Sequence, residues 1–244
     1  MIMNQHLNSF VDDLKTTHKG NLEAVILYGS AASADHDRKH SDYNLLVVLK
    51  KIRPADLRNA HAAIREWAKL GYNVPVYFTT DEIVNAADVF PIEFHQMRRA
   101  RKVLFGRDVL ENVEISNENL RHQVEFELRS KLIMLRRQYI PASESVDGLS
   151  SLMADSLVSF VALFRGVLMV IGVDPPVGRR ATLALTVEQL KLDGQTFEKI
   201  NNIRENNFDH SMNEIEANEL FARYMDQIER VIDMIDSLEV RAVV

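Results

Sequence analysis

Two short polar motifs, each at the end of an apolar segment, have the residue types that bind phosphate and metal ions. Gly29 and Ser30 follow the apolar segment 24–28, and Asp42 shortly precedes the apolar segment 45–49. Both segments have the composition of buried strands. A Gly-Ser turn that opens a helix directs backbone N–H groups and a hydroxyl toward phosphate oxygens. We therefore expect phosphate binding at Gly29 and Ser30, with Asp42 facing the same region.

A Gly-Ser pair, ten residues, a Ser-Asp pair and then an apolar strand resemble the signature of the DNA polymerase beta type nucleotidyltransferase superfamily. This superfamily includes minimal and aminoglycoside nucleotidyltransferases. The resemblance implies a nucleoside triphosphate held at Gly29 and Ser30, with Mg²⁺ held by Asp42, a second acid and a third acid on a later strand. The motif S-D-x-N and the phrases FPIEF and VLFGRDVL resemble a subgroup of predicted nucleotidyltransferases in which Asn replaces the second acid.

The resemblance makes Asp42 the first expected metal ligand and places Asn44 at the position of the second acid. Alternate residues of a strand point to the same face, so ligands at positions i and i+2 can hold the same ion. Mg²⁺ sites that bind phosphates rely on carboxylate charge, but the second position here is an amide, which is a neutral ligand. The resemblance therefore implies Mg²⁺ at Asp42 and an auxiliary metal or nucleotide contact from Asn44, in a weakened site.

The third acid of the superfamily has no counterpart in the strand that we expect next, at residues 72–79. The inward positions of this strand are Val, Tyr or Pro in either register. Asp81 and Glu82 come later and have the pattern of a helix start. Asp88 and Glu93 are candidates for a displaced acid, although their positions are also typical of a helix cap and of an exposed surface residue.

Several basic residues could contact phosphate groups. Four of them form a run, Arg98, Arg99, Arg101 and Lys102, which could neutralise a triphosphate or an RNA backbone. Such a run on a helix is also typical of a solvent-exposed face. His36 and His40 precede Asp42 in the chain and could reach a phosphate, although histidines in exposed loops usually have no such role.

The composition is that of a soluble globular protein, with 46% hydrophobic and 26% charged residues. A net charge of -6 argues against general nucleic-acid binding. The absence of cysteine excludes a disulfide framework, a thiolate zinc site and a cysteine nucleophile. The N-terminus lacks a secretory signal pattern, so we expect a cytoplasmic protein. Asp155 and Arg165 interrupt the most apolar stretch, residues 149–171, which argues against a membrane span.

The first domain, residues 1–115, has the pattern of an α/β (α+β) nucleotidyltransferase core. We expect an opening helix, the two strands already described and one helix from Pro54 to Gly71, followed by the strand at 72–79. Residues 101–106 have the pattern of a last or edge strand. The superfamily resemblance implies a small mixed sheet with helices on one side.

The second domain, residues 116–244, has helical periodicity throughout and predicts an all-α helical bundle. The expected helices are residues 120–139, residues 149–171, a helix capped by Thr186 with Gln189, residues 195–206 and a final helix from Asn213.

A nucleotidyltransferase core followed by a bundle resembles the two-domain aminoglycoside nucleotidyltransferases, in which the acceptor binds in the cleft between domains. It also resembles a core fused to a HEPN-type bundle. HEPN ribonucleases carry an Arg followed after four to six residues by a His, and Arg204 and His210 match this spacing in an expected loop. So short a motif also arises by chance.

Two functional hypotheses follow. In the first, the chain transfers a nucleoside monophosphate from a nucleoside triphosphate to a hydroxyl of a small molecule, RNA or protein. In the second, it is a degenerate nucleotide-binding or protein-interaction module of the same fold. The intact Gly-Ser turn favours the enzyme, and the missing acids favour the degenerate module.

Overall fold

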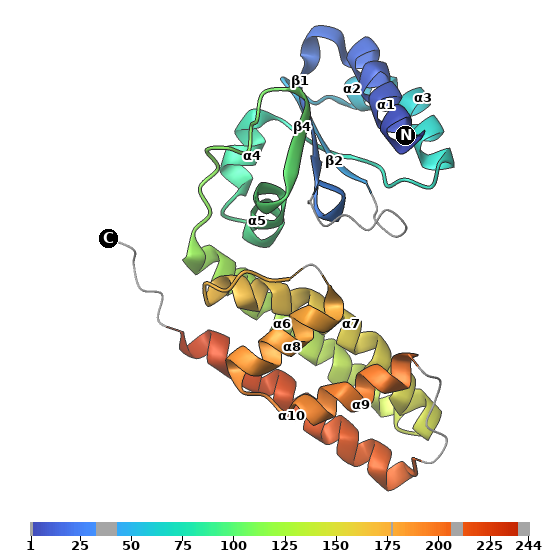
Figure 1. Cartoon of the computed structure of the whole chain (residues 1–244), viewed down its shortest axis with the longest axis vertical. Helices are drawn as coiled ribbons and strands as arrows, with labels where there is room; N and C mark the ends of the chain where they lie inside the picture. The colour runs from blue at the N-terminus through green and yellow to red at the C-terminus, as the bar shows by residue number, and fades with distance from the viewer. Residues whose placement is uncertain (1, 33–42, 177, 206–211, 239–244) are drawn as a thin grey trace. The chain divides into compact units, whose positions relative to one another are not determined.

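The computed structural model describes residues 2–32, 43–176, 178–205 and 212–238. The chain divides into two compact units, Met1–Ser116 and Asn117–Val244, called here the sheet unit and the helical unit (Figure 1). Each unit has its own set of buried side chains, and the candidate nucleotide-binding residues Gly29, Ser30, Asp42 and Asn44 belong to the sheet unit.

The sheet unit contains a four-stranded mixed sheet, as the sequence predicts, in the order β3-β2-β1-β4. The central strand β1 (Leu22–Tyr28) is antiparallel to β2 (Asn44–Leu49) and to β4 (Arg101–Gly106). The edge strand β3 (Val76–Phe78) runs parallel to β2. This strand is shorter than the expected strand at 72–79, because Pro75 has no N–H for a strand ladder and pairing begins directly after it.

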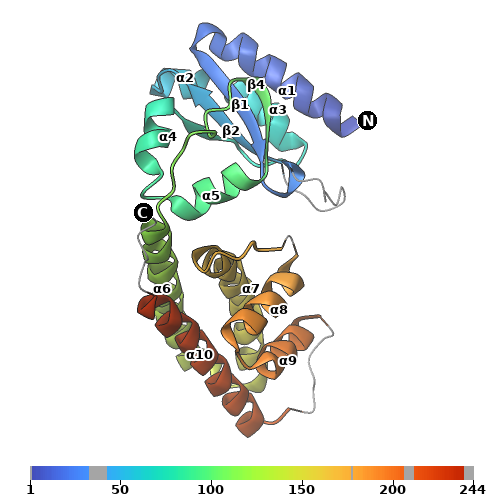
Figure 2. The same cartoon turned by 60° about the vertical axis from the view of Figure 1, so that its left-hand side comes forward.

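Helices cover both faces of this sheet, so the expectation of helices on one side is wrong (Figure 2). The helices α1 (Ile2–His18) and α3 (His61–Lys69) pack on one face, and α4 (Thr80–Ala86) and α5 (Pro91–Arg99) pack on the other. The reason lies in β1 and β2, whose successive residues are apolar without alternation. Such strands are stable only when both faces are buried.

The segment after β2 forms two helices where the sequence predicts one. The first, α2 (Pro54–Asn59), begins at the first-turn proline and is followed by α3. The break at Ala60 leaves Leu57 44% exposed, so the apolar stripe is not continuous. Trp67 anchors α3, because its indole stacks on Phe10 at a ring-centroid distance of 4.4 Å and its N–H donates to the Asn73 carbonyl.

The helical unit is built around one long apolar helix. Its helices are α6 (Asn117–Ala142), α7 (Val146–Val170), α8 (Arg179–Leu190), α9 (Gly194–Glu205) and α10 (Glu214–Ser237). The central helix α7 packs against the other four. By length and composition α7 could cross a membrane, yet 61% of its apolar window is buried inside the structure, as is typical of a bundle core.

Two expectations for the helical unit are wrong. Thr186 does not cap α8 but lies inside it, where its buried hydroxyl donates to the Thr182 carbonyl at 2.8 Å. Arg204 lies in the last turn of α9 rather than in a loop, and its guanidinium donates to the Ala154 carbonyl at 3.3 Å. His210, the other half of the HEPN-like spacing, lies outside the described residues.

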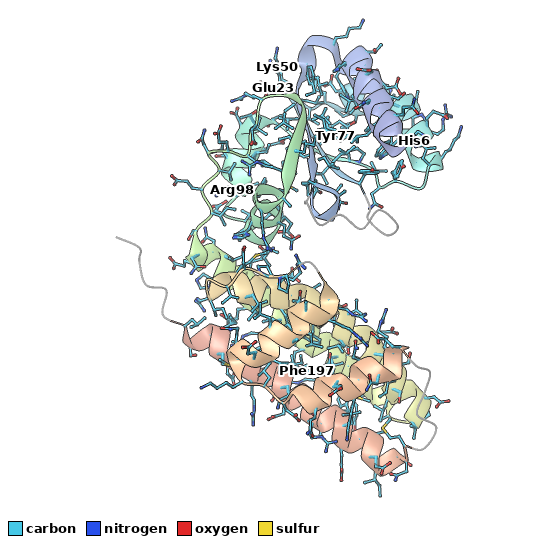
Figure 3. The ribbon with its side chains drawn as sticks, viewed as in Figure 1. His6, Glu23, Lys50, Tyr77, Arg98 and Phe197 are labelled. Carbon is cyan, nitrogen blue, oxygen red and sulfur yellow. The ribbon has the colours of Figure 1, made fainter. Side chains whose placement is uncertain are left out.

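A buried histidine at the end of α1 makes the stability of the sheet unit depend on pH. The Nε2 atom of His18 is buried without a hydrogen-bond partner among the described residues, and the His18 ring meets the Tyr77 ring edge-on. Tyr77 belongs to the edge strand β3 (Figure 3). Burial lowers the pKa of His18, and the Asp56 carboxylate acts in the opposite direction more weakly. The folded protein therefore favours the neutral imidazole.

We predict that the free energy of unfolding decreases as the pH falls below about 6.5, the pKa of an unperturbed histidine. Below that pH the unfolded chain binds a proton at His18, while the folded chain resists protonation. The contribution of His18 to the free energy of unfolding is therefore complete above about 6.5 and is lost as the pH falls toward the lowered pKa of His18 in the folded protein. Urea unfolding between pH 7.5 and 5 should show a shallower decrease for His18→Gln than for the exposed control His61→Gln. Equal slopes in both variants would contradict the assignment.

Separate folding of the two units stays a prediction, and limited proteolysis tests it. Ser116 and Asn117 are exposed, whereas Leu110 and Val113 shortly before them are buried. We expect an early cut at 114–117 that leaves two resistant fragments, with residues 141–148 as the next site. Rapid digestion of residues 1–116 after that cut would show that this unit does not fold by itself.

Candidate functional site

The chain makes a sharp turn at Gly29, directly after the central strand. Gly29 has φ +80°, a left-handed conformation that favours glycine, and Ser30–Ala32 form one 3₁₀ turn. The Gly29 N–H donates to the Ala100 carbonyl at 2.9 Å, and the Ala32 N–H donates to the Gly29 carbonyl at 3.0 Å. The expected helix is thus a 3₁₀ turn in the described part. Because the Gly29 amide is already paired, the N–H groups of Ser30 and Ala31 are the ones that a phosphate could use.

Asn44 lies beside this turn. It is the first residue of β2 and the cross-strand partner of Tyr28, the residue before Gly29. A Cβ added to Gly29 would stand 3.4 Å from the Asn44 Nδ2 atom. The structure therefore brings together two of the predicted site residues, Gly29 and Asn44, through the antiparallel pairing of β1 with β2.

The other predicted site residues are only partly described. Asp42, the expected metal ligand, lies outside the described residues, as do His36 and His40. Ser30 contributes its backbone to the 3₁₀ turn. The roles of the Asp42 carboxylate and the Ser30 hydroxyl stay predictions.

The described residues do not provide the carboxylates of a two-metal site. Val76, the first residue of β3, pairs with Leu46 and is 37% exposed. Val74 precedes the strand and is 62% exposed, and both side chains are apolar. The candidates Asp88 and Glu93 are exposed residues in the turn before α5 and in its first turn. Over the described ranges, no group of three His, Cys, Asp or Glu side chains could hold a metal ion.

A basic residue of β4 lies across Tyr28 from Asn44. Arg101 opens β4 and is the second cross-strand partner of Tyr28, so Asn44, Tyr28 and Arg101 form one row across three strands. Directly opposed residues of antiparallel strands have side chains on the same face. The guanidinium of Arg101 donates from Nε to Asp108 Oδ2 at 2.8 Å and from Nη1 to the Arg98 carbonyl.

The basic run that the sequence suggests is divided between two elements. Arg98 and Arg99 end α5, whereas Arg101 and Lys102 belong to β4. The run does not form one helix face because pairing with β1 begins at Arg101. Asp108 was not a candidate from the sequence, since nothing in the local pattern shows that the chain after β4 returns to Arg101.

These features were compared with known proteins. The chain is similar to the crystal structure of a spectinomycin adenyltransferase from Enterococcus faecialis with ATP and spectinomycin. The TM-score is 0.59 with 14% sequence identity, over 96% of this chain and 99% of that chain. A nucleotidyltransferase-like protein from Exiguobacterium sibiricum 255-15 gives a TM-score of 0.39 with 11% identity, over 94% of this chain and 75% of that chain. No family model and no curated protein matches the sequence.

The fold is a nucleotidyltransferase fold, with a mixed four-stranded sheet and helices followed by a helical region. This confirms the fold that the Gly-Ser and Ser-Asp motifs predict. The S-D-x-N subgroup and the kinship of the helical unit stay hypotheses. At this level of identity the similarity establishes the fold, whereas function depends on the residues of the site.

We predict that Gly29→Ala destabilises the protein by about 1–2 kcal/mol, because a residue with a Cβ is strained at positive φ. Gly71→Ala should cost a similar amount, since Gly71 has φ +84° with no other atom near an added Cβ. Gly20→Ala, at a position with open space, is the control and should change stability by less than about 0.5 kcal/mol. Urea unfolding measures all three, and equal stability of Gly29→Ala and Gly20→Ala would contradict the strain.

Proposed function

We propose that the chain transfers a nucleoside monophosphate from a nucleoside triphosphate to a hydroxyl acceptor. The observation that carries this proposal is the Gly29 turn beside Asn44, at the ends of the antiparallel strands β1 and β2. The proposal is supported by the fold, because the similar adenyltransferase binds ATP. ATP is therefore the first donor to test.

In this proposal the turn holds the phosphates. The N–H groups of Ser30 and Ala31, with the Ser30 hydroxyl, contact phosphate oxygens, and Gly29 lets the backbone approach them closely. The Asn44 amide contacts the nucleotide from β2. The acceptor hydroxyl oxygen attacks the α-phosphorus, and the hydroxyl proton passes to water. The bond from that phosphorus to the oxygen that bridges the α- and β-phosphates breaks, and pyrophosphate leaves. Holding both reactants in line is the main catalytic contribution of such a site.

The Mg²⁺ that the superfamily resemblance implies is not matched by the described residues. Asn44 supplies one neutral oxygen, and the three residues of β3 are Val76, Tyr77 and Phe78, none of which is an acid. Asp42 as a single strong ligand stays a hypothesis from the sequence. The roles assigned above therefore use only this chain's own groups.

The acceptor is proposed only by chemical class. The similar adenyltransferase was solved with spectinomycin, which favours a small hydroxyl-bearing molecule here. RNA and protein hydroxyls are alternatives, but the net charge of -6 disfavours general nucleic-acid binding. Cytoplasmic location is the setting that we propose for such a reaction.

Nucleotide binding is expected to depend on the Gly29 turn. Calorimetry with a non-hydrolysable ATP analogue should show at least about a tenfold weaker affinity for Gly29→Ala than for the wild type. Gly71→Ala introduces comparable backbone strain elsewhere and should retain binding, as should Arg204→Ala in the helical unit. Parallel loss in all three variants would sink the assignment of the site.

A turnover assay distinguishes the enzyme from a module that only binds nucleotides. Asn44 at the second acid position favours a module that binds nucleotides without reaction. Incubation with α-labelled ATP and a panel of hydroxyl acceptors should transfer label to one acceptor with release of pyrophosphate. Tight ATP binding without transfer to a small molecule, RNA or protein would support the binding module instead.

A further inference from the structure

A regular row of exposed apolar side chains runs along α6. Phe126, Ile133 and Ile140 are 69%, 57% and 72% exposed. Single exposed apolar residues are common on soluble proteins, but these three recur at intervals of seven residues. Seven residues make two turns of a supercoiled helix, which is the spacing of side chains that pack against a second helix. We call this row the α6 stripe.

The helices that pack on α6 lie on the side away from the α6 stripe. The buried side of α6, with Val124 and Leu128, packs against α7 and α10 (Figure 2). Ile133 borders a groove of about 310 Å³ between α6 and α10, together with Leu132 and Ile232. The α6 stripe is therefore an apolar ridge with a recess beside its middle residue, and both are open to a partner.

One side of the α6 stripe is neutralised by ion pairs within the chain. Arg129 donates to Glu125 at 2.8 Å and to Asp236 at 3.1 Å. Arg136 donates to Glu229 at 2.7 Å. Because each of these arginines has an acid beside it, a second surface with the same arginines can approach this side without an excess of positive charge.

The other side of the α6 stripe carries one charge of each sign, Glu127 and Arg137. Neither residue forms an ion pair within the part of the chain that the structure describes. At about 100° per residue, Arg137 lies about 40° and Glu127 about 120° from Ile133 in the same direction around the helix. About 15 Å of helix separates the two residues, so they do not pair with each other. Both charges are therefore available to a partner.

We propose that the α6 stripe is the contact surface of a homodimer, in which α6 packs antiparallel to α6 of a second copy about a two-fold axis at Ile133. In this arrangement Ile133 meets Ile133 of the second copy, and Phe126 meets Ile140 at each end. The row is symmetrical about Ile133, so a two-fold axis there covers all of its side chains on both copies.

The same axis brings the two available charges together. Glu127 lies six residues before Ile133 and Arg137 lies four residues after it. In the antiparallel pair, Glu127 and Arg137 of the second copy therefore differ by about 3 Å along the helix, on the same side of the stripe. A parallel pair would place each charge beside its own copy. The surface is thus complementary to itself in the antiparallel direction, which is why we infer a second copy as the occupant.

Sedimentation equilibrium of the full chain tests the dimer. The mass of the wild type should approach twice the chain mass of 27.9 kDa as the concentration rises. Ile133→Asp should raise the dissociation constant at least about tenfold, because two carboxylates would meet in an apolar contact. Val84→Asp, the same kind of change at an exposed residue of α4, should dimerise like the wild type. A wild type that is monomeric even at about 1 mM, or an Ile133→Asp variant that dimerises equally well, would overturn the proposal.

Charge reversal tests the pairing of Glu127 with Arg137. Glu127→Arg and Arg137→Glu should each weaken the dimer by at least about threefold, since each change places like charges together twice in every dimer. The double variant restores opposite charges and should recover the dissociation constant of the wild type. Misfolding cannot produce such a recovery. A double variant that is as weak as the single variants would overturn the antiparallel pairing.

Disulfide formation determines the direction of the helix pair. The sequence contains no cysteine, so a substituted cysteine can pair only with a cysteine of another copy. Ile133→Cys should form a cross-linked dimer on mild oxidation, because both copies of this residue lie at the axis. Phe126→Cys and Ile140→Cys should cross-link when mixed but not separately, since about 21 Å of helix separates each position from its own copy. Cross-linking of each variant with itself, but not in the mixture, would indicate a parallel pair and overturn the proposal.

Discussion

The backbone hydrogen bonds of β1 on both of its edges determine where the site residues lie. Pairing with β2 places Asn44 next to Tyr28, and pairing with β4 places Arg101 on the other side of it. The bond from the Gly29 N–H to the Ala100 carbonyl continues this pairing one residue beyond the strand. A slip of one residue in either ladder would turn Asn44 or Arg101 to the other face and dismantle the row.

Burial on both faces of the sheet makes this register unambiguous. The residues of β1 and β2 alternate between two apolar cores, one under α1 and α3 and one under α4 and α5. A shift in register would leave a mismatch in both cores at once, which costs far more than a mismatch in one. The polar residues come where the apolar segments end, so the site is positioned by a rigid core and not by its own contacts.

The chemistry of this site differs from what its fold suggests. Proteins with a nucleotidyltransferase fold can have different activities or no catalytic activity, because the fold determines where side chains lie and the side chains carry out the reaction. Here the residue of β2 that pairs with Tyr28 is Asn44, a neutral amide, and the residue of β4 that pairs with it is Arg101, whose guanidinium is paired with Asp108.

The sequence by itself determined the strands, the Gly-Ser turn and the helical second half, because these depend on local periodicity and on glycine. Only the tertiary structure decided the helices on both faces, the break at Ala60, the interior place of Thr186 and the pairing of Arg101 with Asp108. Each of these depends on which distant surfaces are buried together. A short stretch of sequence has the same local preference whether or not such a partner is present, so the pattern alone could not distinguish the outcomes.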